Sequence, residues 1–383
     1  MQQTPSSVPA SRLARIAQAR QQALRGDAPA PSHLIEPWIE QSWQRCLKLG
    51  HRPEDPVIFE AVSAQAMRQA AETNRTLVQA ARPILKQLGR AMADTRYFAI
   101  LTNHDGVVVD VDGPIDRTDR RATLITRIGV DLSEKVVGTT AIGAALREMQ
   151  PVWLHRGEHF FNDTSVYSCA GAPVFGPDGR CVGMLELTGV EAAERPELRH
   201  LAAHSVRSIE NALVLQRPHK LLLRLNWPGM PLGEDADGLV GLDADGHVCA
   251  ANWAARQLLP QLATMANTAV HCRDLFALPY EMLFDAARRA PAGIEAPLWS
   301  GLRLQVQSSP GDRSPGFSAV AQWEASPAVP PAKAVPLREV QTALIQKAVE
   351  EARGNVAQAA RALGISRATV YRKLGSVKGG VRS

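Results

Sequence analysis

Apolar side chains return at helical spacing over the first quarter of the chain. From Ser32, a suitable N-cap residue, apolar positions recur every three or four residues as far as Gly50, which predicts an amphipathic helix. A second helical pattern starts near Ser63 and extends to Met92, with Pro83 as a possible break inside it. This helical region leads directly into predicted strands.

The first residues of the chain show a weaker pattern. Residues 1–31 are rich in Gln, Ala, Pro and Arg, and although residues 13–24 could form a helix, Pro29 and Pro31 would end it. We therefore expect a flexible leader over residues 1–31.

Three pairs of short apolar runs surround Asp-Gly turns, which supply the positive φ of a β-hairpin. The paired runs are residues 97–101 with 107–111, 169–174 with 181–187, and 239–242 with 247–250. Helical patterns at 140–147, 197–216 and 252–259 lie between or after these hairpins. Strands and helices in this order predict an α+β multidomain protein with antiparallel sheets.

Proline sets the last domain boundary. Residues 308–336 hold six prolines with several Ser and Gly, which favours a linker. The predicted organisation follows from these patterns: a leader at 1–31, a helical lead-in with a sensor domain at 32–217, a small α+β domain at 218–307, the linker at 308–336, and a helical domain at 337–383.

The helical domain has the pattern of a helix-turn-helix. Asn355 is suited to cap a helix over residues 356–363, Gly364 supplies the turn, and Ser366 caps a second helix over residues 367–374. A helix over residues 337–352 precedes them, and its apolar stripe is suited to a second copy of the chain.

The polar face of the second helix is suited to DNA. Ala368, Thr369, Arg372 and Lys373 project away from the apolar side, as a helix in a major groove requires, whereas Ser366, Arg367 and Tyr371 are placed for phosphates. With the capping Asn355, these residues form the predicted DNA-binding set.

Charge supports this interpretation. The chain has 383 residues and a net charge of only +5, yet from Arg353 onward it carries seven Lys or Arg and no Asp or Glu. Such a local positive field attracts nucleic acid, and the alternative is a solvated basic tail.

Composition limits the remaining classes. At 45% apolar and 21% charged residues, the chain has the composition of a globular protein with two or three domains. The five cysteines show no metal-binding spacing and are typical of reduced cytosolic thiols. We therefore expect no metal site, and we also expect no cofactor and no catalytic residues. Because no membrane span or signal core is evident, we expect a cytoplasmic protein.

Residues 354–374 closely resemble the Fis-type DNA-binding domain, with a nearly continuous match that includes Gly354-Asn355-Val356-Ala357-Gln358 and Val370-Tyr371-Arg372-Lys373-Leu374. The resemblance implies a homodimer that binds double-stranded DNA. A helical hairpin used only for dimerisation is the alternative, although it leaves the acid-free polar face unexplained.

Residues 32–215 resemble the sensor of acetoin-regulator-like activators, a sigma-54-dependent family that joins a GAF domain to a Fis-type terminus. The motifs are Ser42-Trp43-Gln44-Arg45-Cys46, Ser133-Glu134, Gly138-Thr139-Thr140-Ala141-Ile142-Gly143, Gly157-Glu158-His159-Phe160, Cys169-Ala170-Gly171-Ala172-Pro173-Val174 and Gly183-Met184-Leu185-Glu186-Leu187-Thr188. The sequence departs from the family's more frequent residues at three positions: Leu132 stands in place of Trp, Thr140 in place of Asn, and Glu186 in place of Asp.

A GAF sheet covered by helices and loops encloses a pocket, and such sites are mostly apolar with a few polar anchors. The candidate ligand-binding residues are Trp153, His159, Phe160, Tyr167 and Cys169. The alternative is that Trp153, Phe160 and Tyr167 belong to the core and that Glu158-His159 forms a structural cap.

Two features bear on how a signal would be transmitted. The hairpin and helix at 239–259 resemble the opening of a PAS domain, with a bare structural spacer as the alternative. Between Gly189 and Leu337 no GxxxxGK[ST] phosphate loop occurs, so we expect no AAA+ ATPase domain there. The output would then be steric repression, contact with RNA polymerase, or assembly with a full-length ATPase paralogue.

The sequence therefore predicts a DNA-binding transcriptional regulator whose GAF domain senses a small-molecule effector. Two alternatives remain: a Fis-like nucleoid or accessory protein without ligand sensing, and a GAF-based thiol redox enzyme in which Cys169 and Cys181 pair. The redox alternative is weakened because no Lys lies close in sequence to lower a thiol pKa.

Overall fold

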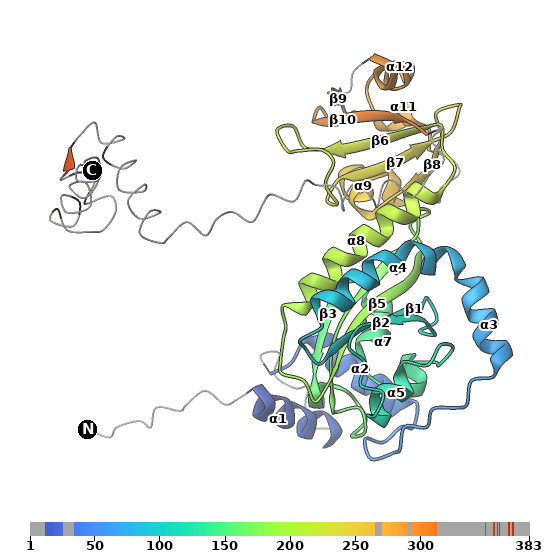
Figure 1. The fold of residues 1–383 in the computed structure, drawn as a ribbon, viewed down its shortest axis with the longest axis vertical. Coiled ribbons are helices and arrows are strands. Elements are labelled where there is room, and N and C mark those ends of the chain that lie inside the picture. The colour runs from blue at the N-terminus through green and yellow to red at the C-terminus, as the bar shows by residue number, and fades with distance from the viewer. Residues whose placement is uncertain are drawn as a thin grey trace, which may run out of the picture. The chain divides into compact units, whose positions relative to one another are not determined.

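The computed structural model describes residues 12–25, 34–264, 270–289 and 293–311 (Figure 1). In the C-terminal segment it describes Val349, Asn355, Val356, Gln358, Ala360, Arg367 and Val370. The chain divides into two compact units, residues 1–316 and residues 317–383. Most of the predicted proline-rich linker lies outside the described residues.

The first of two antiparallel sheets in the N-terminal unit has the strand order β2-β1-β5-β4-β3. Its strands are β1 (Tyr97–Asn103), β2 (Val108–Asp112), β3 (Val152–His155), β4 (Tyr167–Phe175) and β5 (Cys181–Val190). In the central pair, Cys169 lies opposite Thr188 and Gly171 lies opposite Glu186. Neighbouring strands run antiparallel, so the predicted α+β class is confirmed.

The predicted Asp-Gly turns have the expected backbone. Gly106, Gly179 and Gly246 have φ values of +85°, +80° and +84°, a region that glycine adopts without steric cost. In the first turn the side-chain oxygen of Asn103 also accepts hydrogen bonds from the backbone N–H groups of Asp105 and Val107.

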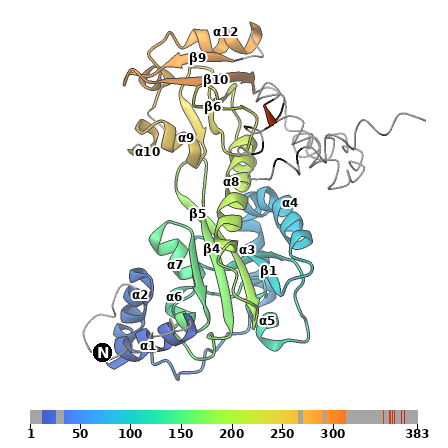
Figure 2. The same ribbon diagram turned by 90° about the vertical axis from the view of Figure 1, so that its left-hand side faces the viewer.

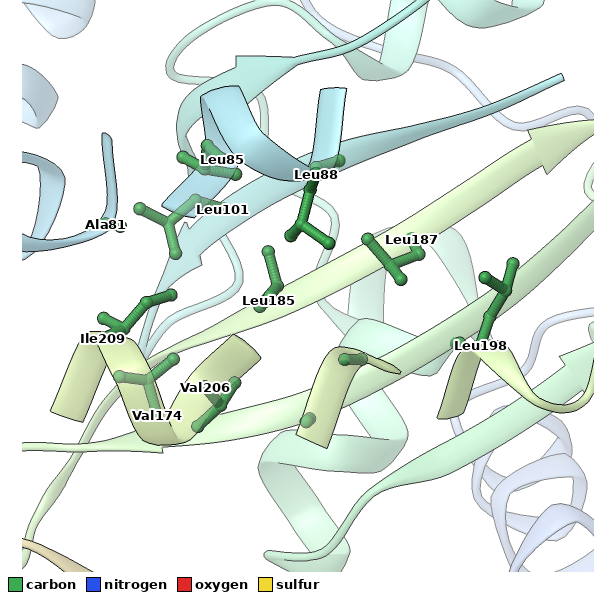
Figure 3. Packing of buried hydrophobic residues seen from close by; sticks show 14 of the residues in the cluster. Ala81, Leu85, Leu88, Leu101, Val174, Leu185, Leu187, Leu198, Val206 and Ile209 are labelled. Atoms are coloured by element: carbon green, nitrogen blue, oxygen red, sulfur yellow. The ribbon is translucent and has the colours of Figure 1, made fainter. Parts of the chain in front are cut away.

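Two long helices cover one face of the first sheet. They are α4 (Arg75–Ala91) and α8 (Leu198–Gln216). Figure 3 shows Leu88 of α4 and Ile209 of α8 facing Leu101, Leu185 and Leu187 of the strands. These leucines are buried, and full burial of such a side chain contributes about 1.5–3 kcal/mol.

Shorter helices pack on the opposite face. They are α5 (Arg120–Ile125), α6 (Glu134–Val137) and α7 (Ala141–Glu148). Figure 2 shows α6 and α7 on this face, and Ala122 and Ile125 of α5 join the same buried cluster. Thr140 caps α7, because its hydroxyl accepts a hydrogen bond from Gly143 N at 3.3 Å. α7 approaches β4 closely at Gly171, where an added Cβ would lie 3.1 Å from the carbonyl oxygen of Ala141.

The predicted flexible leader is partly wrong, because residues 12–25 form helix α1 (Arg12–Arg25). Ile16, Ala19 and Ala23 are buried in a cluster that includes Trp43 and Phe160. The packing partners come from distant parts of the chain, so the pattern of the leader alone did not reveal this burial.

The lead-in helix also begins later than predicted. α2 (Pro37–Lys48) has Glu36 at its N-cap and Pro37 in the first turn, where a missing N–H costs no hydrogen bond. Ser32 lies outside the described residues.

The next helix starts beside Ser63 as predicted, and Ser63 caps it, since its hydroxyl accepts from Ala66 N at 3.1 Å. The break in this helical region is at Asn74, between α3 (Ala64–Thr73) and α4, and not at Pro83, which lies inside α4.

The second sheet has the order β8-β7-β6-β10-β9. Its strands are β6 (Leu221–Asn226), β7 (Gly238–Leu242), β8 (Val248–Ala251), β9 (Ile294–Pro297) and β10 (Arg303–Pro310), and its helices are α9 (Trp253–Leu258), α10 (Gln261–Thr264), α11 (Cys272–Leu275) and α12 (Glu281–Arg289). The start of the predicted linker at 308 is corrected, because β10 pairs with β6 as far as Pro310.

α8 joins the two sheets through buried polar contacts. Asn252 donates to the side-chain oxygen of Asn211 at 2.7 Å, and Phe175 N donates to the carboxyl group of Glu210 at 2.9 Å. The rings of Phe175 and Trp253 stack with centroids 4.5 Å apart. The end of the β4–β5 hairpin therefore contacts the second sheet's first helix.

Across the described parts of the chain, no helix is long and apolar enough to cross a membrane.

Candidate ligand pocket and nucleic-acid interface

A small cavity lies beside the sheet face that α6 and α7 cover. The residues that line it come from β4, β5, α5, α6, α7 and the loops around them: Phe59, Ile125, Leu132, Val137, Thr140, Ile142, His159, Thr164, Tyr167, Cys169, Glu186 and Thr188. Its free space is about 30 Å³. Because one water needs roughly 10–15 Å³ of such space, the cavity has room for about two waters or a molecule of similar size.

One carboxyl group lines this cavity. Glu186 of β5 is buried, and burial raises its pKa to about 7, although hydrogen bonds with Thr188 and Cys169 lower it in part. Among the described residues that line the cavity, there is no Lys or Arg to pair with the carboxylate. The group is therefore substantially protonated near neutral pH.

His159 offers an acceptor without a partner. Its side chain is fully buried, and its Nδ1 lies 3.0 Å from the carbonyl oxygen of Arg156. A carbonyl only accepts, so Nδ1 carries the hydrogen, and burial lowers the pKa of the ring to about 4. The neutral ring then has its lone pair on Nε2, which is buried and has no hydrogen-bond partner among the described residues.

Two of the threonine hydroxyls that line the cavity already have partners. Thr140 accepts from Gly143 N at 3.3 Å, and Thr164 donates to the carbonyl oxygen of Phe161 at 3.0 Å. The hydroxyl of Tyr167 donates to the carbonyl oxygen of Arg121 at 3.2 Å. The polar character of the cavity is therefore set mainly by His159 and Glu186.

The predicted ligand residues divide into two groups. His159, Tyr167 and Cys169 line the cavity. Trp153 packs in the core on the opposite face of the sheet, and Phe160 packs against α1 and α2. The structure thus places Trp153 and Phe160 in the core, which was the alternative interpretation.

The sequence interpretation missed Thr140, Glu186 and Thr188 as cavity residues, yet it contained a signal for two of them. The three departures from the resembled family, Leu132, Thr140 and Glu186, all line the cavity. The alternation of β5 could also have found them, because Glu186 and Thr188 face the same side of the sheet.

Glu158 has a structural role beside the cavity. Its carboxyl group accepts from His155 N at 2.6 Å and from Arg12 at 2.9 Å and 3.0 Å, and it completes a capping box on the short 3-10 helix η1 (Arg156–Glu158). The Trp43 indole donates to its carbonyl oxygen at 2.9 Å. This arrangement holds His159, the next residue, in a fixed backbone position.

A second polar network fixes α2 against the cavity wall. Arg45 donates to both oxygens of Glu134 at 2.6 Å and 2.8 Å, and Ser42 contacts Glu134 at 2.8 Å and Thr139 at 2.7 Å. Glu134 begins α6, whose Val137 lines the cavity. These contacts unite three of the motifs that carry the family resemblance.

A larger open hollow of about 640 Å³ lies beside α1 and includes Arg20 and Glu194 in its lining. The Arg20 guanidinium donates there to the carbonyl oxygens of Gly157 at 3.2 Å and His159 at 2.6 Å. The hollow is open to solvent, whereas the smaller cavity is more enclosed and mostly apolar, so the smaller cavity is the better candidate site.

The redox pair of the alternative interpretation, Cys169 with Cys181, is not formed. Cys181 lies opposite Phe175 at the far end of the β4–β5 hairpin, six residues along β4 from Cys169. At roughly 3.3 Å per residue they are about 20 Å apart, far beyond a disulfide. Burial also raises the pKa of both thiols. The described residues contain no group of three or more His, Cys, Asp or Glu that could hold a metal ion.

The described part of the C-terminal unit agrees with the predicted core of the helix-turn-helix. Ala360 and Val370 are buried, and Val349 and Val356 pack against them. The Asn355 side-chain oxygen accepts from Gln358 N at 3.1 Å, as the predicted cap requires. Arg367 is exposed. Ser366, Ala368, Thr369, Tyr371, Arg372 and Lys373 lie outside the described residues.

Comparison with protein families assigns both ends of the chain. Residues 13–211 match the family described as MimR, N-terminal domain, and residues 336–375 match the family described as bacterial regulatory protein, Fis family. The first match covers about half of the chain and contains the cavity.

Similar proteins are transcriptional regulators. The acetoin catabolism regulatory protein of Cupriavidus necator is 29% identical over 257 residues, which are 65% of this chain and 37% of the relative. A propane 2-monooxygenase operon transcriptional activator MimR, from Mycolicibacterium goodii, is 29% identical over 209 residues, or 54% of this chain and 34% of that protein. The match thus spans little more than a third of either relative.

Solved structures are more distantly similar. The E. coli DhaR(N)-DhaL complex contains a chain that is 17% identical, with a TM-score of 0.44 over 72% of this chain and 100% of that chain. A GAF sensor protein from Burkholderia vietnamiensis is 18% identical, with a TM-score of 0.25 over 40% of this chain and 96% of that chain.

Proposed function

Because the chain belongs to the MimR N-terminal domain family and carries a Fis-family segment, we propose that it is a DNA-binding transcriptional regulator controlled by a small molecule. The sensor domain holds the effector in the cavity between the first sheet and α6 and α7. The Fis-type segment binds promoter or enhancer DNA.

The observation that carries the proposal is the Fis-family match at residues 336–375 in a chain whose other half is a regulator's sensor. Ser366, Arg367 and Tyr371 contact phosphates, and Ala368, Thr369, Arg372 and Lys373 face the major groove. The protein acts as a homodimer in the cytoplasm, with the apolar stripe of residues 337–349 between the copies. His159, Tyr167 and Cys169 contact the effector.

A direct test is selection of binding sites from fragmented genomic DNA by the full-length protein, followed by affinity measurements on the enriched sequences. We expect a shared, approximately palindromic site, because a two-fold dimer reads two half-sites. We also expect affinity to fall steeply with salt concentration. Failure to enrich any sequence above random DNA would contradict the proposal.

Substitutions of two basic residues can distinguish recognition of DNA bases from contact with DNA phosphates. Arg372→Ala should reduce affinity for the enriched site by about 1–3 kcal/mol and relax its sequence preference, whereas Lys378→Ala should weaken binding uniformly and reduce the salt slope by about one. Affinities for the enriched and scrambled duplexes at several salt concentrations give both quantities. Equal losses on both duplexes for Arg372→Ala would assign that side chain to phosphate alone.

A further inference from the structure

The outward faces of α4 and α8 are basic. The two helices lie side by side on the first sheet (Figure 1). Their exposed cations are Arg75, Lys86 and Arg90 of α4 and Arg199 and Arg207 of α8, and we call these five residues the basic face. The three residues of α4 follow one another at spacings of eleven and four residues, which places them along one side of the helix.

Nearby acidic side chains do not neutralise the basic face. α4 contains no Asp or Glu, and the one acidic residue of α8, Glu210, is buried. Arg82 of α4 is paired with Asp110 at 2.9 Å and is therefore not counted in the basic face. Within the described part of the chain, none of the five cations of the basic face forms an ion pair.

The basic face does not follow from an overall positive charge. Residues 1–316 contain 33 Lys or Arg and 34 Asp or Glu, so this unit is close to neutral as a whole. Lys86 and Arg90 lie four residues apart on one helix, where like charges repel each other. A polyanion bound to this face would offset that repulsion.

Duplex DNA fits the basic face better than a second copy of the chain does. Two copies that met through this face would bring like charges together, which opposes association. A duplex presents a continuous row of phosphates, and exposed Arg and Lys side chains bind phosphates without reading the bases. The Fis-type segment of the same chain would hold a duplex nearby, so the second contact would be intramolecular.

The length of the intervening chain permits both contacts. Residues 312–335 join the last residue of the described second sheet region, Gly311, to the Fis-family match. These 24 residues can span at most about 85 Å. At about 3.4 Å per base pair, this limit equals about 25 base pairs of duplex.

We propose that the basic face is a second DNA-binding surface, which contacts phosphates of the duplex that flanks the site bound by the Fis-type segment. The proposal rests on the proposed DNA-binding function and adds a contact from the sensor half of the chain. Because phosphate contacts carry no sequence information, the contribution of this surface depends on duplex length and on salt concentration.

Duplex length separates this surface from the Fis-type segment. We suggest fluorescence-anisotropy titrations of the full-length protein with an enriched site in a duplex of about 20 base pairs, enough for two half-sites. The second probe is the same site with about 25 base pairs of unrelated sequence on each side. We expect the wild type to bind the long duplex about tenfold more tightly than the short duplex at low salt concentration, with a steeper dependence on salt.

A triple variant of α4, with Arg75→Gln, Lys86→Gln and Arg90→Gln, removes three cations from the basic face while keeping residues that favour a helix. It should lose most of the preference for the long duplex and reduce the salt slope on that duplex by about two to three. Its affinity for the short duplex should stay near wild type, which also shows that the variant is folded.

A matched control removes the same charge from other surfaces. The control variant carries Arg52→Gln, Arg147→Gln and Arg289→Gln, three exposed arginines outside α4 and α8, and should keep the preference for the long duplex. The double variant Arg75→Lys and Arg90→Lys should also keep it, since a phosphate contact needs the charge and not the guanidinium shape.

Three results would overturn the inference. The first is an unchanged preference for the long duplex in the α4 variant, and the second is an equal loss of this preference in the α4 variant and the control. The third is a shift of the monomer–dimer equilibrium of the α4 variant in sedimentation experiments without DNA, with the long-duplex preference retained, which would assign the face to a second copy. Specific binding of the short duplex by the unmodified chain would still support the regulator function in each case.

Discussion

Two buried glutamates occupy different environments in the N-terminal unit. Glu186 lines the cavity, whereas Glu210 of α8 accepts a hydrogen bond from Phe175 N near the second sheet. Burial raises the pKa of each to about 7. A buried acid with few donors is costly to ionise, so both residues should make stability depend on pH.

Glu210→Gln tests this dependence away from the cavity. The folded protein keeps the Glu210 proton up to about pH 7, whereas the unfolded chain releases it near the ordinary value of about 4.5. Folded protein thus binds more protons between these values, and the wild type loses stability as pH rises through the window. Relative to wild type, the variant's free energy of unfolding should increase by roughly 2–3 kcal/mol between pH 5 and pH 8.

Urea denaturation at several pH values measures this difference. Glu197→Gln, a change of an exposed side chain just before α8, serves as the control and should show no such trend. Parallel pH profiles for Glu210→Gln and wild type would contradict the assignment.

Asn355 combines two predicted roles that substitution can separate. Its side chain caps the helix through Gln358 N, and serine can make the same bond whereas alanine cannot. Asn355→Ala should therefore destabilise this helix by about 1 kcal/mol and weaken DNA binding, while Asn355→Ser should be close to wild type in a fluorescence-anisotropy titration. An equal loss for both variants would instead indicate that the Asn355 amide contacts DNA directly.

At the scale of elements, α2 is held to the wall of the cavity by charge-assisted hydrogen bonds. Arg45 and Glu134 form a two-bond pair in which both side chains are mostly buried, at 25% and 18% exposure. Bonds of this kind contribute about 1.5–3 kcal/mol each. The packing of α2 against the cavity wall should thus depend on Glu134 of α6.

Arg45→Met keeps the aliphatic stem but removes the pair. We expect faster hydrogen exchange over residues 37–48, because α2 then opens locally from its site. Lys48→Met, which changes an exposed residue of the same helix, is the control and should leave exchange unchanged. If Arg45→Met leaves exchange over α2 at the wild-type rate, the pair does not hold the helix.

The elements that the sequence predicted well are those with a local signal. Asp-Gly turns marked the hairpins of β1–β2, β4–β5 and β7–β8, and Ser63 and Asn355 marked helix starts. Pro83 was misleading because the carbonyl that loses its partner belongs to Gln79, an exposed residue of α4 that solvent can hydrogen-bond. Burial of Leu85 and Leu88 on the other face compensates for that loss.

Features that depend on distant contacts were missed. α1 is stabilised by Trp43 and Phe160, and β6 pairs with β10 across some 80 residues of sequence. The cavity was only partly predicted for the same reason: aromatic residues suggested a pocket, but the sheet alternation places Trp153 on the opposite face from Cys169. Side-chain type identified candidates, whereas register decided which of them meet.

At the scale of the N-terminal unit, one strand connects the cavity with the second sheet. β4 begins at Tyr167, which lines the cavity, and ends at Phe175, which stacks on Trp253. Ala251 N also donates to the carbonyl oxygen of Pro177 just beyond this strand. A change in strand position caused by an effector would therefore reach the second sheet through packed side chains, as coupling between sites requires.

Trp253→Ala tests this route. The substitution removes an aromatic stack worth about 0.5–1.5 kcal/mol beyond its buried area but leaves the cavity and the Fis-type segment unchanged. We expect effector binding in the cavity and ligand-free DNA affinity to stay near wild type, while the ratio of DNA affinities with and without the effector moves toward one. Trp227→Ala is a matched control, because Trp227 has a similar exposure, 43% against 41%, and does not form this stack. An effector changes DNA binding only through contacts that differ between the bound and free states of the sensor. If the ratio of DNA affinities in Trp253→Ala equals that of the wild type, the coupling does not pass through the contact between β4 and Trp253.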